Sequence, residues 1–190
     1  MVTQKKETKK LYTPVFRVGF PFVFEPRETE NGDKYEVVML FPKSADLTAL
    51  KKAASEAARE KWGEKIPSNL HSPFRDGAEK ADIDGFGPDV IFVRAWSKNA
   101  PGIVDRDGKT PITSPQEFYG GCFARATVSA FAYDRKEKKG VTFMLQNLQK
   151  VKDGDAFSGR THAEDDFEAI ADDYEGAAAP PAAAGDSLFE

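Results

Sequence analysis

Cysteine and histidine are scarce in this chain, and their scarcity excludes two kinds of site. Cys122 is the only cysteine, so no disulfide can form within the chain. His71 and His162 are the only histidines, too few to complete a zinc site of Cys and His ligands. Cys122 stands inside an apolar run, where a small buried thiol is the expected role. We therefore predict neither a metal nor a cofactor.

Long hydrophobic runs are also missing. No stretch approaches the roughly 18 consecutive apolar residues that a membrane-spanning helix needs. The first residues include lysines but no apolar segment behind them, so we do not expect a secretory signal. The prediction is a cytosolic protein with no membrane partner.

Basic residues are absent from the C-terminal end of the sequence, so the two parts of the chain carry net charges of opposite sign. The last of the 27 Lys and Arg residues is Arg160, and nine of the 31 acidic residues follow it. Residues 1–160 thus carry a net charge of +5 (27 basic against 22 acidic residues), and residues 161–190 carry −9. A basic body can attract a polyanion, and an acidic tail can compete for the same surface.

Short segments rich in aromatic and β-branched residues predict a mainly β protein with one or two helices. A helix is expected over residues 44–62, with Ser44 or Asp46 as the N-cap and Gly63 as the stop. A turn signal at residues 30–33 predicts a β-hairpin, with a bulge or bend near Gly19 and Pro21. Strands are expected at residues 11–24, 35–41, 89–98, 118–133 and 141–151, and the glycines at 120 and 121 mark a candidate bend in the fourth of them. This order fits a small β-barrel better than a parallel α/β sheet.

Two segments carry no such pattern. Residues 63–88 are rich in Gly and Pro and predict a long ordered loop, of a length that usually has a function. Residues 161–190 combine acidic residues with an Ala/Pro/Gly linker and cannot bury enough apolar surface to order themselves. We expect this tail to be disordered when the protein is unbound.

The alternation of side chains along two predicted strands is the sequence feature that indicates a binding surface. Arg94, Trp96 and Lys98 share one face of their strand with Val90 and Phe92, while the opposite set suits a core. In the later strand one face carries Arg125, Thr127, Ser129, Phe131 and Tyr133. Cations that follow phosphates and rings that stack on unpaired bases are how single-stranded nucleic acid is held. The competing interpretation is a second apolar layer under the helix, which we favour for Phe92 and Phe131, whereas Trp96 and Tyr133 stay open.

A carboxylate cluster offers a different chemistry. Asp82, Asp84 and Asp89 have the residue type that binds a divalent cation in a nuclease. Carboxylates in a loop rich in Gly and Pro are more often solvated turn formers. We therefore expect no enzyme, and keep a metal-dependent nuclease on a barrel of this kind as an alternative.

Long motifs in the second half of the chain resemble a known family. They are EFYGGCFARATVSAFAYD at residues 117–134 and GVTFMLQNLQKVKDG at 140–154, with PFRDG at 73–77 and AEDDF at 163–167. Together they resemble a bacteriophage family of single-stranded DNA-binding proteins long catalogued as a domain of unknown function. The resemblance implies an OB-fold β-barrel that binds single strands without sequence preference, in phage DNA replication, recombination and repair. It also implies action in the cytoplasm of the bacterial host cell.

The resemblance and the alternation together give an expected site and domain plan. The plan is a flexible basic arm (1–10), an OB-fold DNA-binding domain (11–160) and a disordered acidic tail (161–190). The motif segments add Tyr119 and Arg75 to the DNA-binding set from the strands, which is Arg94, Trp96, Lys98, Arg125 and Tyr133. The tail residues expected to bind partners are Asp165, Asp166, Phe167, Asp186, Leu188 and Phe189.

The tail is expected to recruit a polymerase, helicase or nuclease and to compete with DNA. Phage tails of this kind often end on an aromatic residue, whereas here Glu190 follows Phe189, so a role for a terminal phenylalanine carboxylate is in doubt. The remaining alternative is a virion or scaffold-type interaction protein whose tail recruits other subunits.

Overall fold

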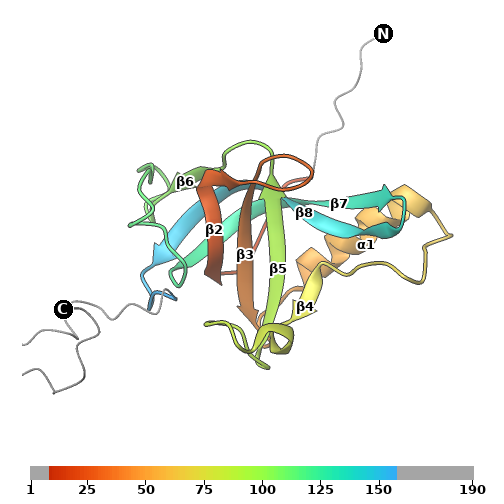
Figure 1. Cartoon of the computed structure of the whole chain (residues 1–190), viewed down its shortest axis with the longest axis horizontal. Helices are drawn as coiled ribbons and strands as arrows, with labels where there is room; N and C mark the ends of the chain where they lie inside the picture. Colours follow the sequence, from red (N-terminus) through yellow and green to blue (C-terminus); the bar gives the residue numbers. More distant parts are fainter. Residues whose placement is uncertain (1–8, 158–190) are drawn as a thin grey trace, which may run out of the picture. The chain divides into compact units, whose positions relative to one another are not determined.

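The computed structural model describes residues 9–157, which contain eight strands, an α-helix and a 3₁₀ helix (Figure 1). The helices are α1 (Thr48–Trp62) and η1 (Gly77–Lys80). The strands are β1 (Leu11–Tyr12), β2 (Phe16–Arg27), β3 (Lys34–Pro42), β4 (Phe74–Asp76), β5 (Val90–Ser97), β6 (Gly102–Val104), β7 (Phe123–Arg135) and β8 (Lys138–Lys152). The predicted tail lies outside the described residues.

Five strands close into a barrel. Their order around it is β2-β3-β5-β8-β7, and β7 pairs with both β8 and β2 to complete the ring. The β5–β8 pair is parallel, and the other four pairs are antiparallel. This is the Greek-key arrangement of a five-stranded OB-fold, which confirms the predicted fold class.

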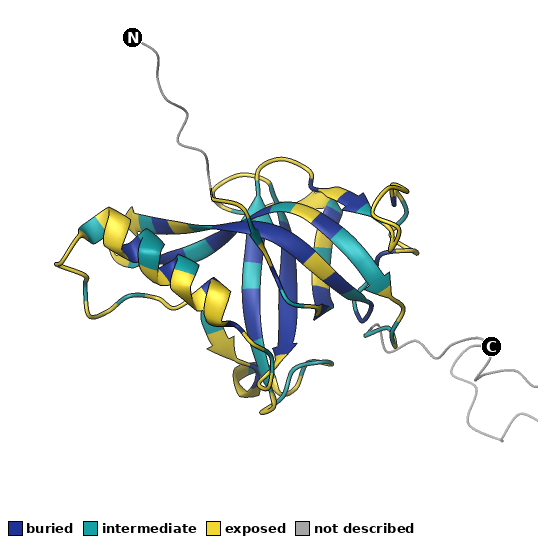
Figure 2. Ribbon diagram, turned by 180° about the vertical axis from the view of Figure 1, so that it is seen from behind, coloured by how far each residue is buried: buried dark blue, intermediate teal, exposed yellow. Residues whose placement is uncertain are grey.

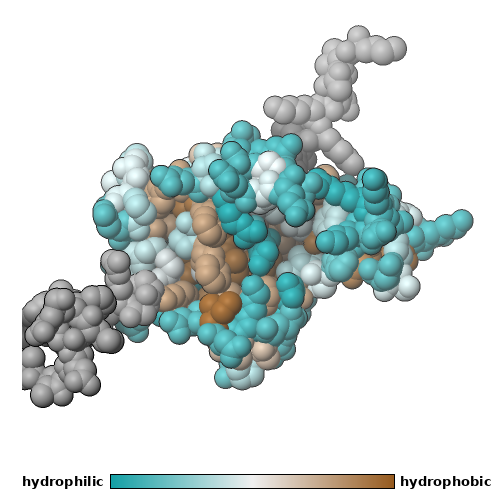
Figure 3. Space-filling view, viewed as in Figure 1, coloured by the Kyte–Doolittle hydropathy of each residue, from teal (hydrophilic) through white to brown (hydrophobic). Residues whose placement is uncertain are grey.

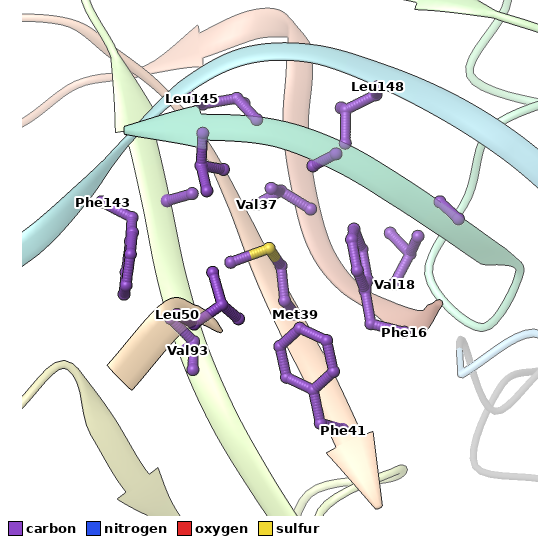
Figure 4. Close-up of a cluster of buried hydrophobic side chains, with 14 of the residues drawn as sticks. Phe16, Val18, Val37, Met39, Phe41, Leu50, Val93, Phe143, Leu145 and Leu148 are labelled. Atoms are coloured by element: carbon purple, nitrogen blue, oxygen red, sulfur yellow. The ribbon is translucent and has the colours of Figure 1, made fainter. Parts of the chain in front are cut away.

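Alternate residues of these strands fill the barrel interior, and Figure 2 shows buried residues along the barrel strands. Figure 4 shows Leu50 of α1 among core side chains from the barrel strands. Leu50, Ala54 and Ala58 are the buried residues of the helix, as the amphipathic pattern requires. Burying this stripe fixes α1 against the barrel.

Turn chemistry sets several boundaries. Gly32 takes a positive φ of 93° in the β2–β3 turn, and the β2–β3 register shifts between Gly19 and Phe22, so the predicted hairpin and bulge are both confirmed. The amide of Gly63 donates to the carbonyl of Arg59, which ends α1 where predicted. The helix starts later than expected: Leu47 is its N-cap residue, and Asp46 accepts a hydrogen bond from the amide of Thr48.

Three other boundaries were wrong. The strand predicted from residue 118 begins at Phe123, because residues 118–122 form a turn in which Gly121 has a φ of 113°. The loop predicted at 63–88 contains β4 and η1, and β6 was not anticipated. β4 and β6 have three residues each, too few for a local pattern, and form strands because they pair with β5 and β8. No described helix is long and apolar enough to cross a membrane.

Candidate nucleic-acid interface

The outer face of β2, β3 and β5 is built from three cross-strand rows, because directly paired residues point to the same side of a sheet. The first row is Phe22–Glu36–Trp96, the second is Gly19–Val38–Arg94, and the third is Arg17–Leu40–Phe92. In Figures 1 and 2 these three strands lie on the opposite side of the barrel from β7 and β8. The predicted face of Phe92, Arg94 and Trp96 therefore continues across two more strands.

The first row joins an exposed ring and a half-buried one to cations. The ammonium of Lys34 lies 4.4 Å from the centre of the Trp96 ring, and the guanidinium of Arg27 lies 5.9 Å from that of Phe22. Glu36 stands between the two rings with its carboxylate 3.7 Å from Arg27. Phe22 is 37% exposed, so a flat ring is available beside these cations.

Three cations gather around the second row. The Nε of Arg94 is buried and makes no hydrogen bond within the described residues. Lys80 of η1 is close enough to feel both Arg94 and Arg75: partial burial, then these two charges, lower the pKa of its ammonium. Arg75 is also ion-paired with Glu79, and Glu36 and Glu79 partly offset the effect of the two guanidinium groups on Lys80. The three cations and the unpaired donor of Arg94 still form a cluster that favours an anion.

The third row continues onto β4 on one side and onto β7 and β8 on the other, and cations lie beside rings along it. Arg75 of β4 pairs with Phe92, and its guanidinium lies 5.2 Å from that ring. On the other side, Arg17 pairs with Phe123 of β7, which pairs in turn with Lys152 of β8. Lys152 lies 4.6 Å from the centre of the Phe123 ring.

Further aromatic rings pack over the third row. Phe86 meets Phe92 edge to face at 5.2 Å between ring centres, and Phe20 lies 6.1 Å from Phe86. Phe20 sits in the bulge of β2 with a φ of 42° and is 43% exposed. Figure 3 shows an apolar patch over β2 and β3 that is flanked by hydrophilic side chains. We name this surface the basic–aromatic face, and its members are Phe20, Phe22, Phe86, Phe92, Trp96, Arg27, Lys34, Arg75, Lys80 and Arg94.

The segment after β8, residues 153–157, borders the basic–aromatic face, and we call it the strap. Arg17 donates to the carbonyl of Asp155 at 2.8 Å and lies 4.4 Å from the centre of the Phe157 ring. Phe157 packs against the cluster of Val38, Leu40 and Phe92. A β-carbon at Gly85 would overlap the Phe157 ring and one at Gly121 would overlap the carbonyl of Asp155, so both positions need glycine. The strap is therefore held against the barrel and forms part of its surface.

The structure brings four of the seven predicted DNA-binding residues to this region. Arg94 and Trp96 lie on the face, Arg75 joins it through β4, and Lys98 is exposed just beyond the end of β5.

The other three predicted residues lie elsewhere. Arg125 donates to the side-chain oxygen of Gln149 at 2.7 Å. Tyr133 pairs with Gly140 near the far end of the β7–β8 hairpin. The Tyr119 hydroxyl lies 3.0 Å from a carboxylate oxygen of Asp153 and holds the start of the strap. Hydrogen bonds from Lys150 and then from Tyr119 lower the pKa of the Asp153 carboxyl.

The apolar-layer prediction has a mixed outcome. Phe92 is 1% exposed, but it is covered by Phe86 and Phe157 rather than by α1. Phe131 is 50% exposed, so the prediction that it is buried was wrong. Phe131 lies on the part of β7 beyond Val128, where β7 pairs only with β8 among the described strands.

The aspartates considered for a nuclease do not assemble. Asp82, Asp84 and Asp89 are each exposed in the loop before β5. Within residues 9–157 no group of three or more His, Cys, Asp or Glu side chains is arranged to hold a metal ion. The geometry therefore gives the nuclease alternative no support.

Sequence reasoning assigned only Arg75, Arg94 and Trp96 of the ten members of the face to DNA binding. Lys34 and Lys80 lie at a strand start and in a 3₁₀ helix, where no alternation marks them. Phe22 and Phe20 belong to a bulged strand, and a bulge breaks the period of two that assigns residues to faces. The cations come close to the rings only because strands that are far apart in the sequence pair in the sheet.

Comparison with known proteins places the chain in a family. Residues 9–177 match the family described as Enterobacter phage Enc34, ssDNA-binding protein. Putative protein p50 of Acyrthosiphon pisum secondary endosymbiont phage 1 is 32% identical over 157 residues, covering 75% of this chain and 83% of that relative.

Solved structures share the fold. The single-stranded DNA-binding protein from bacteriophage Enc34 in complex with ssDNA matches with a TM-score of 0.65 at 20% identity, covering 80% of this chain and 91% of that one. The single-stranded DNA-binding protein gp2.5 of bacteriophage T7 matches with a TM-score of 0.60 at 13% identity, covering 89% and 99%. The family match and the phage relative together show that this chain belongs to the Enc34 family of phage ssDNA-binding proteins.

Proposed function

We propose that this protein binds single-stranded DNA on the basic–aromatic face, without sequence preference and without catalysis. The observation that carries the proposal is the first cross-strand row, which puts the exposed Phe22 ring and the half-buried Trp96 ring beside Arg27 and Lys34 on one outer face of an OB-fold barrel. OB-folds bind oligonucleotides on this part of the barrel, where the second and third barrel strands pair. Family membership supports the same ligand.

A phosphate group fits the second row. Arg94 offers a buried unpaired donor, and Lys80 and Arg75 add charge around it. A phosphate oxygen would satisfy that donor and relieve the repulsion among the three cations. Lys98, just beyond β5, would contact the next part of the backbone.

Bases would stack on the rings that flank these cations. Trp96, Phe22 and Phe20 each present at least part of a ring to solvent. Stacking contributes roughly 1–3 kcal/mol per base and accepts every base, because each has a π-face. Rings and phosphate-directed cations together give affinity with little sequence information.

The tail would regulate this face and recruit partners. Residues 161–190 carry a charge of −9 beside a body of +5, so we propose that the tail competes with DNA for the cations. Once DNA displaces the tail, Asp165, Asp166 and Phe167, with Asp186, Leu188 and Phe189, would bind a polymerase, helicase or nuclease. The protein would act in phage replication, recombination and repair in the host cytoplasm, with residues 1–10 as a basic arm, 11–160 as the DNA-binding domain and 161–190 as the tail.

Fluorescence anisotropy with labelled oligo-dT tests the DNA proposal. We expect tight binding that weakens steeply between about 50 and 200 mM salt, because binding releases counterions. Unlabelled duplex of the same length should compete poorly. Binding that duplex removes as well as single strands do, or no binding at low salt, would reject the proposal.

A less acidic tail tests the competition. Replacing Asp165, Asp166, Asp172 and Asp173 with Asn in the full chain should raise affinity for oligo-dT at low salt, with a smaller gain at high salt. The matched control replaces four acidic residues of the body far from the face. Unchanged affinity at about 50 mM salt would show that the tail does not compete.

A further inference from the structure

Glu36 is the only acidic residue among the nine residues of the three cross-strand rows. It occupies the middle of the first row, paired with Phe22 of β2 on one side and with Trp96 of β5 on the other. The β-carbons of directly paired residues lie about 5 Å apart, so the side chain of Glu36 stands beside both rings. A negative charge at this point repels the phosphates that the surrounding cations attract, so affinity for the DNA backbone does not explain it.

The carboxylate of Glu36 is nearly buried but has few partners. The side chain is 12% exposed, and the residue as a whole is 9% exposed. Its ion-pair partner is Arg27 at 3.7 Å, which is too long for a hydrogen bond. Lys80 is close enough to feel the charge, but within residues 9–157 no group donates a hydrogen bond to this carboxylate. Glu36 therefore has acceptor capacity that the described part of the chain leaves unused.

A DNA strand lying on the first row would remove the remaining water from this carboxylate. Taking an ionised group out of water is costly unless new hydrogen bonds replace those of the water. Neither the phosphates nor the deoxyribose rings within a DNA strand carry a hydrogen-bond donor. The donors that the strand offers are the N–H groups of its bases. Contact with DNA thus directs a base, rather than the backbone, toward Glu36.

The Watson–Crick edge of a base supplies such donors, and it is free only in a single strand. Every base has at least one N–H on this edge: adenine and cytosine have an amino group, and thymine has N3–H. Guanine has two neighbouring donors, N1–H and the N2 amino group, which match the two oxygens of a carboxylate. A carboxylate acceptor at this point therefore accepts every base but ranks guanine first.

We propose that Glu36 accepts hydrogen bonds from the Watson–Crick edge of a base that stacks on the first row, and that this base site favours guanine. The ring of Phe22, which is 37% exposed, supports the base, and Arg27 balances the charge of the carboxylate. The preference concerns one base position and is superposed on binding that otherwise takes any sequence. This inference rests on the proposed function, since it needs DNA on the basic–aromatic face.

Guanine and hypoxanthine form a matched pair of ligands, because hypoxanthine lacks only the N2 amino group. The experiment uses the full-length protein and oligonucleotides of the repeat TTG, about 12 nucleotides long, with guanosine or inosine at the third position. Anisotropy competition is carried out in lithium chloride, which does not support guanine quadruplexes. The wild type should bind the guanine form about 3- to 10-fold more tightly, which is the effect of one additional hydrogen bond to the carboxylate.

Two variants separate hydrogen bonding from charge. Glu36→Gln keeps the shape of the side chain but replaces one acceptor oxygen with a donor amino group, so the ratio of the two affinities should fall to nearly one. Glu79→Gln removes an equal charge from η1 and should keep the wild-type ratio. If Glu36 served only to position Arg27, Glu36→Gln would change the affinity for both oligonucleotides equally and leave the ratio intact.

The outcomes distinguish the base site from the proposed function. Equal binding of the two oligonucleotides by the wild type, an unchanged ratio in Glu36→Gln, or loss of the ratio in both variants would overturn the role of Glu36 while leaving DNA binding in place. Failure of the wild type to bind either oligonucleotide at low salt would reject the proposed function itself, and the base site with it.

Discussion

The strands β5 and β7 present similar outer faces in sequence but have different surroundings in the structure. Each alternates small core residues with a set that contains an arginine and aromatic rings. On β5 the arginine is Arg94, whose Nε is buried beside two other cations. On β7 it is Arg125, which is exposed and hydrogen-bonded to Gln149.

Neighbouring strands account for this difference. β5 is flanked by β3 and β4, and η1 follows β4, so rings and cations from four elements converge on its outer face. β7 pairs with β8 along its whole length, and beyond Val128 its other edge is unpaired within the described residues. Alternation within a strand tells which residues share a face, whereas the neighbours decide what that face can bind.

The largest expected effect contrasts the two phenylalanines, Phe92 and Phe131. Phe92→Ala should lower the free energy of unfolding by about 3–5 kcal/mol, because it removes a ring that is 1% exposed and leaves a cavity among Val38, Leu40 and Phe86. Phe131→Ala should change it by no more than about 0.5 kcal/mol, because half of that ring is already in water. Urea denaturation of both variants measures the contrast.

The m-value serves as the internal control in that experiment. It should stay the same in both variants if each unfolds in a single step from the native fold. Equal losses of stability for the two variants would mean that Phe131 is covered in solution.

The two arginines give the next effect. Arg94→Met should weaken binding to oligo-dT by about 1.5–3 kcal/mol, roughly 10- to 150-fold, because it removes the donor and charge proposed to hold a phosphate. Its stability should be unchanged or slightly higher, since the buried Nε without a partner disappears. Arg125→Met is the matched control on β7, and anisotropy titrations at fixed salt compare the two.

Loss of affinity in both variants to the same extent would place Arg125 on the DNA path as well. Loss in Arg125→Met alone would reject the basic–aromatic face as the interface. Either result would change which of the two strands, β5 or β7, is assigned to DNA binding.

The fold was predictable because its signals are local. Pro14 and Gly19 mark the interruptions of the first strands, and residues 30–33 mark the hairpin turn. Leu50, Ala54 and Ala58 mark the buried stripe of α1. What failed was the start of β7, where five residues with strand-like composition form a turn held by the glycine at 121.

The site was predictable only where one strand carried it. Arg94 and Trp96 follow from alternation along β5, whereas Lys34 reaches the Trp96 ring only because β3 pairs with β5 in one particular register. Tyr119 came from a motif, but its hydroxyl is bonded to the strap, a contact 34 residues away in sequence. Cross-strand register cannot be read from a single sequence, so the composition of the face could not be predicted.

Loss of an aromatic ring gives a smaller contrast. Trp96→Leu should weaken binding by about 1–3 kcal/mol, because it removes one stacking platform but keeps an apolar side chain on the strand. Tyr133→Leu should leave affinity unchanged, since Tyr133 lies near the end of the β7–β8 hairpin away from the face. Trp96→Phe should recover most of the loss. If Trp96→Phe binds as weakly as Trp96→Leu, the indole contributes something other than stacking.

The smallest effect is a dependence on pH that only the β5 side should show. In the unbound protein, partial burial and then the charges of Arg94 and Arg75 lower the pKa of Lys80 below its ordinary value of 10.5. A bound phosphate would raise that pKa again, so binding takes up a proton once the pH exceeds the lowered value. Affinity should hold constant at neutral pH and fall a few-fold as the pH rises through the lowered pKa toward 10.5. Lys80→Arg should reduce this fall and move its onset to higher pH, because a guanidinium stays charged throughout the range. Anisotropy with oligo-dA at constant salt is the measurement, since adenine does not titrate there. Parallel curves for Lys80→Arg and the wild type would remove Lys80 from the phosphate site while leaving Arg94 in place.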